Sequence, residues 1–225
     1  GVNPSNATTY ESDDLWSYEL GFKSSLADNR ITLNAAVFMV DWQDVQQLNR
    51  LACGFQFTQN AGEAESRGFE VELVAMPTEG LMISAAVGYT DATITNAGGV
   101  SGVKNGDKVQ GVADLTATLS AQYIWQAFGP WNGIVRADGN YYGDSYSGNN
   151  EASSASQRLR PSWNALNLRA GIIDDNWEIM AFIENATDER ANLADSRSIA
   201  AETPGRARLV TNRPRTVGMD VRYKF

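Results

Sequence analysis

The sequence contains no histidine and a single cysteine, Cys53, among its 225 residues. Without histidine, the Ser-His-Asp and Cys-His systems of nucleophilic catalysis cannot form, and most zinc sites lose a preferred ligand. Paired carboxylates remain at Asp13-Asp14 and Asp174-Asp175, but adjacent aspartates in loops and turns are ordinarily solvated. We therefore predict that the chain is not an enzyme and has no catalytic residue, no metal site and no cofactor.

Positive charge and long apolar runs are also scarce. The net charge is −9 and the isoelectric point is about 4.6, so the phosphates of a nucleic acid would be repelled. Apolar residues make up 43% of the chain, yet none of them form the run of about 20 that a transmembrane helix needs. These features exclude nucleic acid as a partner and helical membrane spans. They do not exclude membrane-spanning strands, in which only alternate residues face lipid.

The sequence is instead rich in strand-like alternation of apolar and polar residues. From Leu115 to Trp125 the alternation slips only once, and the final stretch from Pro214 to Phe225 alternates up to an aromatic carboxy-terminus. Similar or weaker alternation occurs at 31–39, 69–73, 81–89, 135–140, 166–172 and 177–183. Alternation alone shows that each strand has two different sides. Its repetition along the chain predicts one large sheet.

Nine strands are predicted in this way. They cover residues 15–25, 31–45, 64–76, 81–95, 111–125, 131–145, 163–173, 177–187 and 214–225. Short connections of at most five residues alternate without exception with connections of fifteen or more. This is typical of a transmembrane β-barrel, in which one rim has tight turns and the other has the loops that meet ligands. We therefore predict an all-β, antiparallel, up-and-down transmembrane β-barrel segment with short periplasmic turns and long extracellular loops.

Aromatic residues lie near the ends of these strands, where indole and phenol rings favour the boundary between water and lipid. They are Trp16, Trp42, Tyr89, Trp125, Trp131, Tyr141, Trp163, Trp177 and Tyr223. Each one singly could also be an ordinary core aromatic of a sheet.

Four blocks resemble the carboxy-terminal barrel region of TonB-dependent outer-membrane receptors. Residues 17–46 resemble a recurrent hairpin of that family, residues 60–73 (NAGEAESRGFEVEL) one of its strands, and residues 183–190 (IENATDER) a later segment. The ending, residues 212–225 (NRPRTVGMDVRYKF), resembles the final strand of the family. The resemblance spans nearly the whole chain, and the four blocks occur in the order that the family has.

The resemblance implies a receptor in the bacterial outer membrane that takes up a scarce nutrient, most often a ferric siderophore. Its implied partners are membrane lipid, the barrel assembly machinery, the small-molecule substrate and the TonB energy-coupling complex, which acts through a plug domain. Bacterial barrels ordinarily have an even number of strands. We therefore expect residues 1–225 to be the carboxy-terminal portion of a longer receptor barrel, with the plug domain and the earlier strands absent.

Candidate site residues fall into three groups. Glu70 and Glu72 alternate with apolar residues, so they share one side of a strand, and like charges facing lipid would be costly. We place them in the lumen, facing ligand or plug, together with Arg136, Asp138 and Arg169. In the largest loop, Arg197, Arg206 and Arg208 are candidates for contacts with an anionic ferric chelate or, alternatively, with the lipid leaflet and neighbouring loops. The family resemblance assigns Tyr223 and Phe225 to the barrel-assembly signal.

Other interpretations remain open from the sequence. A passive porin or a smaller complete barrel would have the same alternation, and strand pairs recurring about every 50 residues also occur in kelch-type propellers. A propeller blade has four short strands, whereas each unit here has two long ones. Cys53, in a long loop, is either paired with a cysteine upstream of Gly1 or unpaired.

The loop arginines give a first testable prediction. Replacing Arg206 and Arg208 together by alanine in the full-length receptor should weaken substrate uptake, because two guanidinium groups that suit carboxylate or catecholate oxygens are lost. Radiolabelled ferric-chelate uptake and equilibrium binding measure the effect. An unchanged binding affinity would exclude the loop as a ligand site.

Overall fold

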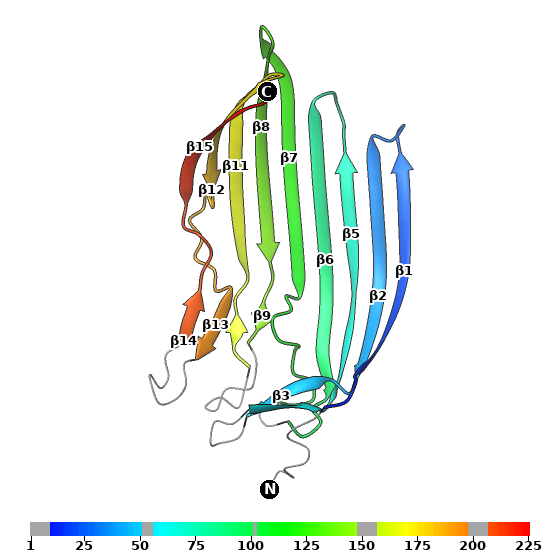
Figure 1. Cartoon of the computed structure of the whole chain (residues 1–225). Coiled ribbons are helices and arrows are strands. Elements are labelled where there is room, and N and C mark those ends of the chain that lie inside the picture. The colour runs from blue at the N-terminus through cyan, green and yellow to red at the C-terminus, as the bar shows by residue number, and fades with distance from the viewer. Residues whose placement is uncertain (1–9, 51–55, 101–102, 148–156, 198–206) are drawn as a thin grey trace.

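All nine predicted strands are present in one antiparallel sheet. The structure, a computed structural model, describes residues 10–50, 56–100, 103–147, 157–197 and 207–225. Neighbours along the chain are neighbours in the sheet throughout, as an up-and-down topology requires (Figure 1). In sheet order the strands are β1 (Asp14–Leu26), β2 (Ile31–Gln43), β5 (Glu63–Ala75), β6 (Leu81–Asn96), β7 (Leu115–Phe128), β8 (Trp131–Tyr142), β11 (Trp163–Ile173), β12 (Trp177–Glu184) and β15 (Thr216–Tyr223). Among the described residues, no helix is long and apolar enough to cross a membrane.

Several strand ends differ from the prediction by up to four residues, and two of these differences have an evident local reason. β7 begins at Leu115 instead of residue 111, because Gly111 has a φ of +75° and the backbone turns there before the strand starts. β12 ends at Glu184 instead of residue 187, because Asn185 adopts a positive φ of 50° and its side chain bonds to the loop backbone. Both strands are therefore shorter at their loop-bearing end than predicted.

Three small hairpins were not predicted. Each is built within a long connection and forms its own two-stranded sheet at the loop-bearing end, the lower end in Figure 1. They are β3 (Gln46–Arg50) with β4 (Gln56–Asn60), β9 (Ser145–Tyr146) with β10 (Leu159–Arg160), and β13 (Ala194–Arg197) with β14 (Ala207–Val210). The loops therefore have regular structure of their own.

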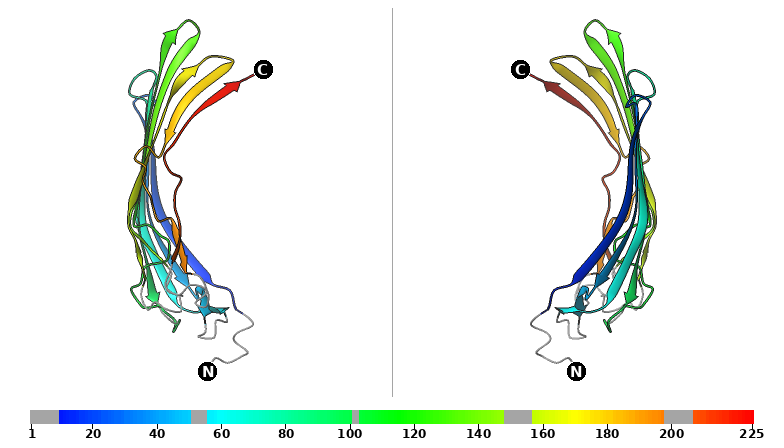
Figure 2. Two further views of the ribbon diagram at one scale, coloured as in Figure 1. Left: turned by 90° about the vertical axis from the view of Figure 1, so that its left-hand side faces the viewer. Right: turned by 90° about the vertical axis from the view of Figure 1, so that its right-hand side faces the viewer.

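The sheet is a single curved layer, and Figure 2 shows its trough shape from both sides. Its accessible surface is 14412 Å², against about 10,000 Å² expected for a compact monomer of this mass. No large side chain among the described residues is fully buried. The layer therefore has no protein core on either side, and its stability must come from strand pairing and from whatever contacts its two faces.

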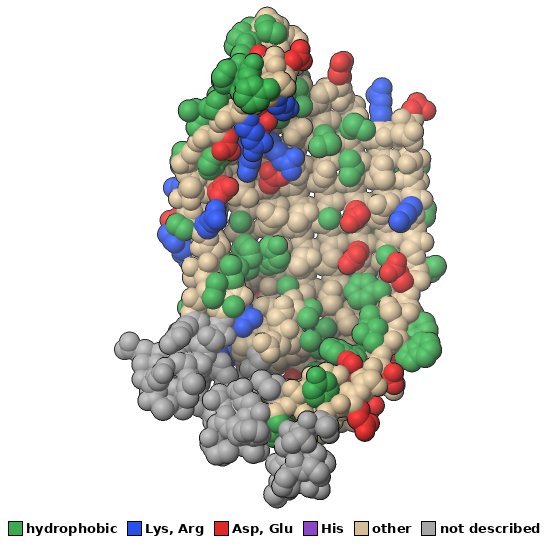
Figure 3. Space-filling view, in the orientation of Figure 1, with side chains coloured by type: hydrophobic (Ala, Val, Ile, Leu, Met, Phe, Trp, Pro, Cys, Tyr) green, Lys and Arg blue, Asp and Glu red, His purple; other side chains and the backbone are tan. Residues whose placement is uncertain are grey.

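The two faces differ in chemistry as the alternation predicts. On the convex face, Leu119 and Val221 expose 58% and 52% of their surface, and Leu20 exposes 75%. The concave face is mostly polar and uncharged, with scattered acidic and basic side chains (Figure 3). Apolar residues of this size would ordinarily be buried in a water-soluble domain. The convex face is therefore suited to lipid and the concave face to water or polar protein.

The apolar band on the convex face has the height of a membrane. On β7 it runs from Leu115 to Trp125, which at about 3.3 Å per residue and a strand tilt of about 40° spans roughly 25 Å. Tyr123 and Trp125 stack at the turn end with ring centroids 5.6 Å apart, and Phe69 and Tyr89 stack nearer the loop end at 5.9 Å. The band is thus bordered by aromatic rings at both ends.

Two of the nine predicted boundary aromatics are on the other face. The strand register places Trp42 and Trp163 on the concave side, so their assignment to the lipid boundary was wrong. The Trp42 indole Nε1 donates a hydrogen bond to Asp13 Oδ2 at 2.7 Å, and Trp163 stacks on Tyr142 with ring centroids 4.4 Å apart. Both rings therefore help to attach loop-end segments inside the trough.

Three aromatic rings cover glycines on the adjacent strand. Phe38 lies opposite Gly68, Trp125 opposite Gly133, and Phe182 opposite Gly218, each as directly paired Cα partners. A side chain added at any of these glycines would overlap the facing ring. The rings thus fill the space that glycine leaves and shield the backbone there.

We predict that Gly68→Ala destabilises the folded sheet by about 1–3 kcal/mol, because the new methyl group would overlap the Tyr89 carbonyl oxygen and the Phe38 ring. Denaturant unfolding in lipid vesicles measures this change. Gly139→Ala is the matched control, since its nearest atom would be the Leu119 carbonyl oxygen at 3.8 Å, an ordinary contact. Equal stability of the two variants would contradict the proposed packing.

Candidate functional site

Glu70 and Glu72 lie on the concave face at the middle of β5. Their register partners on β6 are Gly88 and Ala86, so the neighbouring side chains are small and leave the carboxylates open to the trough. Asn34 of β2 donates its Nδ2–H to Glu72 Oε2 at 3.3 Å. A shallow hollow of about 190 Å³ beside the two glutamates continues to β7. Within the described ranges neither glutamate has a cationic partner, so this is a locally negative region of the wall.

A second charged cluster lies across β8 and β11. Arg136 and Asp138 are two residues apart on β8, so both face the trough, and Arg136 binds the carboxylate bidentately with N–O distances of 2.6 to 2.9 Å. Arg169 of β11 is the direct register partner of Arg136. Its guanidinium lies 5.9 Å from the Phe182 ring centroid and 3.9 Å from a Glu184 oxygen.

The structure therefore brings three of the five predicted lumen residues together. Arg136, Asp138 and Arg169 form one cluster, whereas Glu70 and Glu72 lie on β5, with β6 and β7 between them and the cluster. Among the described residues, the arginines have carboxylate partners, whereas the two glutamates have no cationic partner. The wall thus presents one neutralised polar region and one acidic region to anything inside the trough.

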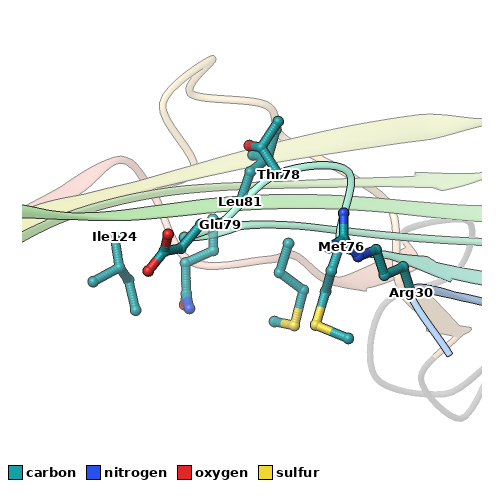
Figure 4. A pocket seen from close by; sticks show the side chains of 9 residues that line it. Arg30, Met76, Thr78, Glu79, Leu81 and Ile124 are labelled. Atoms are coloured by element: carbon teal, nitrogen blue, oxygen red, sulfur yellow. The ribbon is translucent and has the colours of Figure 1, made fainter. Parts of the chain in front are cut away.

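An open pocket of about 510 Å³ lies at the turn end of the concave face. Met76, Leu81 and Ile124 supply most of its apolar lining, and Figure 4 shows Glu79 beside Ile124 and Arg30 beside Met76 at the opposite side. The pocket is amphipathic, since Arg30, Thr78 and Glu79 line it together with these apolar side chains. It has the character of a packing surface for a mixed polar and apolar segment.

The predicted loop arginines are only partly described. Arg197 ends β13, where it pairs with Ala207, and Arg208 lies in β14 opposite Ser196. Arg206 lies outside the described residues, as does Cys53. The hairpin places the backbones of Arg197 and Arg208 at the loop-bearing end, one on each strand.

The base of this loop is held by Asp188. The Arg215 backbone N–H donates to Asp188 Oδ1 at 2.9 Å, and an Arg190 nitrogen lies 3.3 Å from the same oxygen. The hydrogen bond from the Arg215 N–H, followed by the nearby arginine charges, holds the pKa of Asp188 below its ordinary value. This contact therefore stabilises the loop base above about pH 4 and is lost as the pH falls through the lowered pKa.

Sequence reasoning missed several amide side chains at the loop bases. Asn60, Gln157 and Asn185 each bond to backbone groups of another segment. Asn60 and Asn185 lie inside two of the blocks that resemble the receptor family, at residues 60–73 and 183–190. That position was the only available signal, because an isolated asparagine predicts no particular contact.

The carboxy-terminal aromatics lie on the convex face. Tyr223 contacts Trp177 of β12 with ring centroids 4.7 Å apart, and Phe225 meets Tyr223 edge to face at 5.2 Å. Pairing continues beyond the last assigned strand residue, since Lys224 N–H donates to the Asn176 carbonyl oxygen at 2.8 Å. The final strand thus ends on an exposed aromatic ladder.

The comparison with protein families decides the identity of this sheet. Residues 5–186 match the family model described as TonB dependent receptor-like, beta-barrel. The chain belongs to the TonB-dependent receptor family. Members of this family are transport receptors of the outer membrane and not enzymes, as the sequence predicted. The nine-stranded sheet is accordingly part of an outer-membrane β-barrel, and its concave face is the lumen wall.

Two relatives show the range of similar receptors. The chain is 28% identical over 127 residues to the metal-pseudopaline receptor CntO of Pseudomonas aeruginosa, covering 56% of this chain and 17% of that protein. It is 24% identical over 212 residues to the probable TonB-dependent siderophore receptor PiuA of Acinetobacter baumannii, covering 90% of this chain and 27% of that protein. The chain thus spans less than a third of the length of both relatives.

Solved receptor structures have the same fold. The ferric yersiniabactin uptake receptor FyuA of Yersinia pestis superimposes with a TM-score of 0.76 at 21% identity, over 95% of this chain and 30% of that chain. The siderophore receptor PiuA of Acinetobacter baumannii gives 0.73 at 21% identity, over 100% and 30%. At these identities the similarity establishes the fold of the TonB-dependent receptor barrel.

We predict that Asp138→Asn lowers the free energy of unfolding by about 1 kcal/mol, because it removes a bidentate charge-assisted pair and leaves Arg136 beside Arg169. Asp220→Asn is the matched control, with the same charge change on the same face and no ion pair within the described residues. Denaturant unfolding in vesicles measures both. A control that costs as much as Asp138→Asn would mean that net charge, and not the pair, matters.

Proposed function

We propose that this chain is part of a receptor for energised, TonB-dependent uptake of a metal chelate, most specifically a ferric siderophore. The observation that carries the proposal is a single-layer sheet of this family with an exposed apolar convex face and a polar concave face. The names of the relatives support the substrate class, because CntO is a metal-pseudopaline receptor and PiuA is a probable siderophore receptor. Such chelates are bulky and polar, which suits a wide polar lumen.

We also propose that residues 1–225 form the carboxy-terminal portion of the barrel domain of a longer receptor. The chain spans 27% of PiuA and 30% of the FyuA chain, which supports this assignment. In the intact receptor, a plug domain would contact the lumen wall and couple it to the TonB complex. Lipid would cover the convex band, and the barrel assembly machinery would read the final strand at Tyr223 and Phe225.

The charged wall clusters have different roles in this proposal. Glu70 and Glu72 have no cationic partner among the described residues, so they are available to a cation of the plug or to polar groups of a passing ligand. Arg136 and Asp138 satisfy each other, and Arg169 is held more loosely, with its nearest carboxylate oxygen at 3.9 Å. Arg169 is therefore the most available guanidinium of the cluster.

The loop arginines would recognise the substrate outside the cell. Arg197 and Arg208 come from facing strands of one hairpin. Guanidinium groups bind carboxylate and catecholate oxygens in a planar, bidentate way, which suits the donor atoms of an iron chelate. Arg206 would contribute from the connection between the two strands.

Growth and transport measurements test the proposal. Deleting the gene in the host bacterium and limiting iron should abolish growth on at least one ferric hydroxamate, catecholate or carboxylate chelate, and restoring the gene should rescue it. Uptake of the same chelate labelled with ⁵⁵Fe should stop when the proton-motive force is collapsed. Uptake that persists without energy would indicate a passive porin. Unchanged growth on every metal chelate tested would exclude this substrate class.

A further inference from the structure

Side-chain amides join backbone segments of the loop-bearing rim at three places. Asn60, Gln157 and Asn185 each donate to a backbone carbonyl oxygen of another segment and also accept a backbone N–H, which for Asn185 is that of Glu189 in the same loop. An amide that bonds in both directions replaces a missing piece of backbone pairing. Each one lies in a long connection at the loop-bearing end. The three residues therefore act where regular strand pairing ends.

Asn60 forms the largest number of these hydrogen bonds to the backbone. Its Oδ1 accepts the Glu11 N–H at 2.6 Å, and its Nδ2 lies within hydrogen-bonding distance of the carbonyl oxygens of Glu11 at 2.9 Å, Asp44 at 3.0 Å and Ser12 at 3.3 Å. One side chain thus joins the segment entering β1, the end of β2 and the end of β4. All four hydrogen bonds of this side chain are made to backbone groups.

The β3–β4 hairpin, described over residues 44–50 and 56–62, forms a shelf on the concave side of the sheet. Figures 1 and 2 show it crossing below the ends of β2, β5 and β6, toward the inside of the trough. Its inner side is apolar and closed, since Val45, Phe57 and Ala61 expose only 6–7% of their surface. The shelf is therefore a packed element over the lumen opening.

Backbone contacts attach the shelf to the next loop. Gly62 has a φ of +90°, and a side chain there would overlap the Asn96 carbonyl oxygen at the end of β6. Gly98 approaches Gly62 and Ala61 equally closely, and Val100 beside it is only 3% exposed. The shelf and the β6–β7 loop thus form one packed unit.

Gln157 and Asn185 extend this unit around the rim. The Lys108 backbone N–H donates to Gln157 Oε1 at 2.9 Å, and Gln157 Nε2 donates back to the Lys108 carbonyl oxygen, which joins the β6–β7 and β8–β11 loops. Asn185 Nδ2 donates to the carbonyl oxygens of Glu189 at 3.0 Å and Arg213 at 2.8 Å, which closes the base of the β12–β15 loop.

We propose that Asn60 is a positioning residue for ligand binding. Its amide holds the shelf over the lumen mouth in the arrangement that receives the substrate, and Gln157 and Asn185 hold the neighbouring loops in the same way. This inference rests on the proposed function for its ligand, but not for its structural part. A preorganised mouth binds without first ordering its loops, so loosening the shelf should reduce affinity.

The test is Asn60→Asp in the intact receptor. The substitution keeps the shape of the side chain but turns the donor into an oxygen that faces the carbonyl oxygens of Glu11, Ser12 and Asp44. We expect hydrogen exchange at the Glu11 and Ala61 amides to accelerate about tenfold or more, and the dissociation constant for a bound ferric hydroxamate, catecholate or carboxylate chelate to rise by a similar factor. The amount of folded barrel, measured by heat-modifiable electrophoretic mobility, should not change.

Acid should partly rescue the variant. A carboxylic acid regains one O–H donor when protonated, and the surrounding carbonyl oxygens favour that form, so the new carboxyl should titrate above its ordinary value near 4. The ratio of variant to wild-type dissociation constants is therefore expected to fall as the pH is lowered from 7 to 4.5. Local damage unrelated to the amide would leave this ratio constant.

The control places the same substitution far from the loop-bearing rim. Asn132→Asp is the matched control because Asn132 lies on the concave face at the turn end of β8, and within the described part of the chain its side chain makes no hydrogen bond, so the same charge change should leave exchange and affinity within twofold of wild type. Wild-type exchange rates in Asn60→Asp would overturn the inference, as would faster exchange with unchanged affinity. If the wild-type receptor binds none of the chelates, the proposed function fails, whereas the exchange rates still decide whether Asn60 holds the shelf.

Discussion

The structure depends on a continuous antiparallel backbone ladder in a sheet that has no second protein layer. Each strand satisfies the backbone groups of its neighbours, as a membrane interior requires. The convex side chains gain nothing from burial inside the chain, since Leu20, Leu119 and Val217 are mostly exposed. The hydrophobic effect therefore acts between the sheet and the bilayer, and the usual distinction between core and surface is reversed. Packing within the protein is confined to cross-strand pairs, such as the rings over glycines, and to the loop-bearing rim.

The wall could be predicted from the sequence because alternation reports directly on the two environments of a membrane strand. In β7 the regular alternation from Leu115 to Trp125 located the strand and both of its faces. The alternation is blurred between Val37 and Trp42, where apolar residues occur on both sides. The structure shows the reason: Phe38 covers Gly68, and Trp42 bonds to Asp13, so concave positions there contact protein instead of water. Where lipid covers one face of a strand and protein covers the other, the alternation of apolar and polar residues no longer predicts which face points to lipid.

The rim was much less predictable. The hairpins in the long connections have strands of two to five residues, too short for a periodic pattern to stand out. Their positions depend on contacts between residues far apart in sequence, such as Asn60 with Glu11 and Gln157 with Lys108. For the lumen candidates, the charge and the side of the strand could be read from the sequence, but the partners could not. The pattern could not show that Arg136 and Asp138 bind each other while Glu70 has no cationic partner among the residues that the structure describes.

The use of neutral amides at the rim has a consequence for the environments in which the receptor can work. Amides do not titrate and attract few counterions, and the chain has no histidine that would change charge near neutrality. The bonds of Asn60, Gln157 and Asn185 are therefore insensitive to pH, whereas other contacts at the same end, such as Asp13 with Trp42 and Asp91 with Lys108, involve ionisable groups. Where acid or salt weakens those charged contacts, the amides would still hold their three loop bases, so the entrance would keep part of its geometry in acidic and saline habitats.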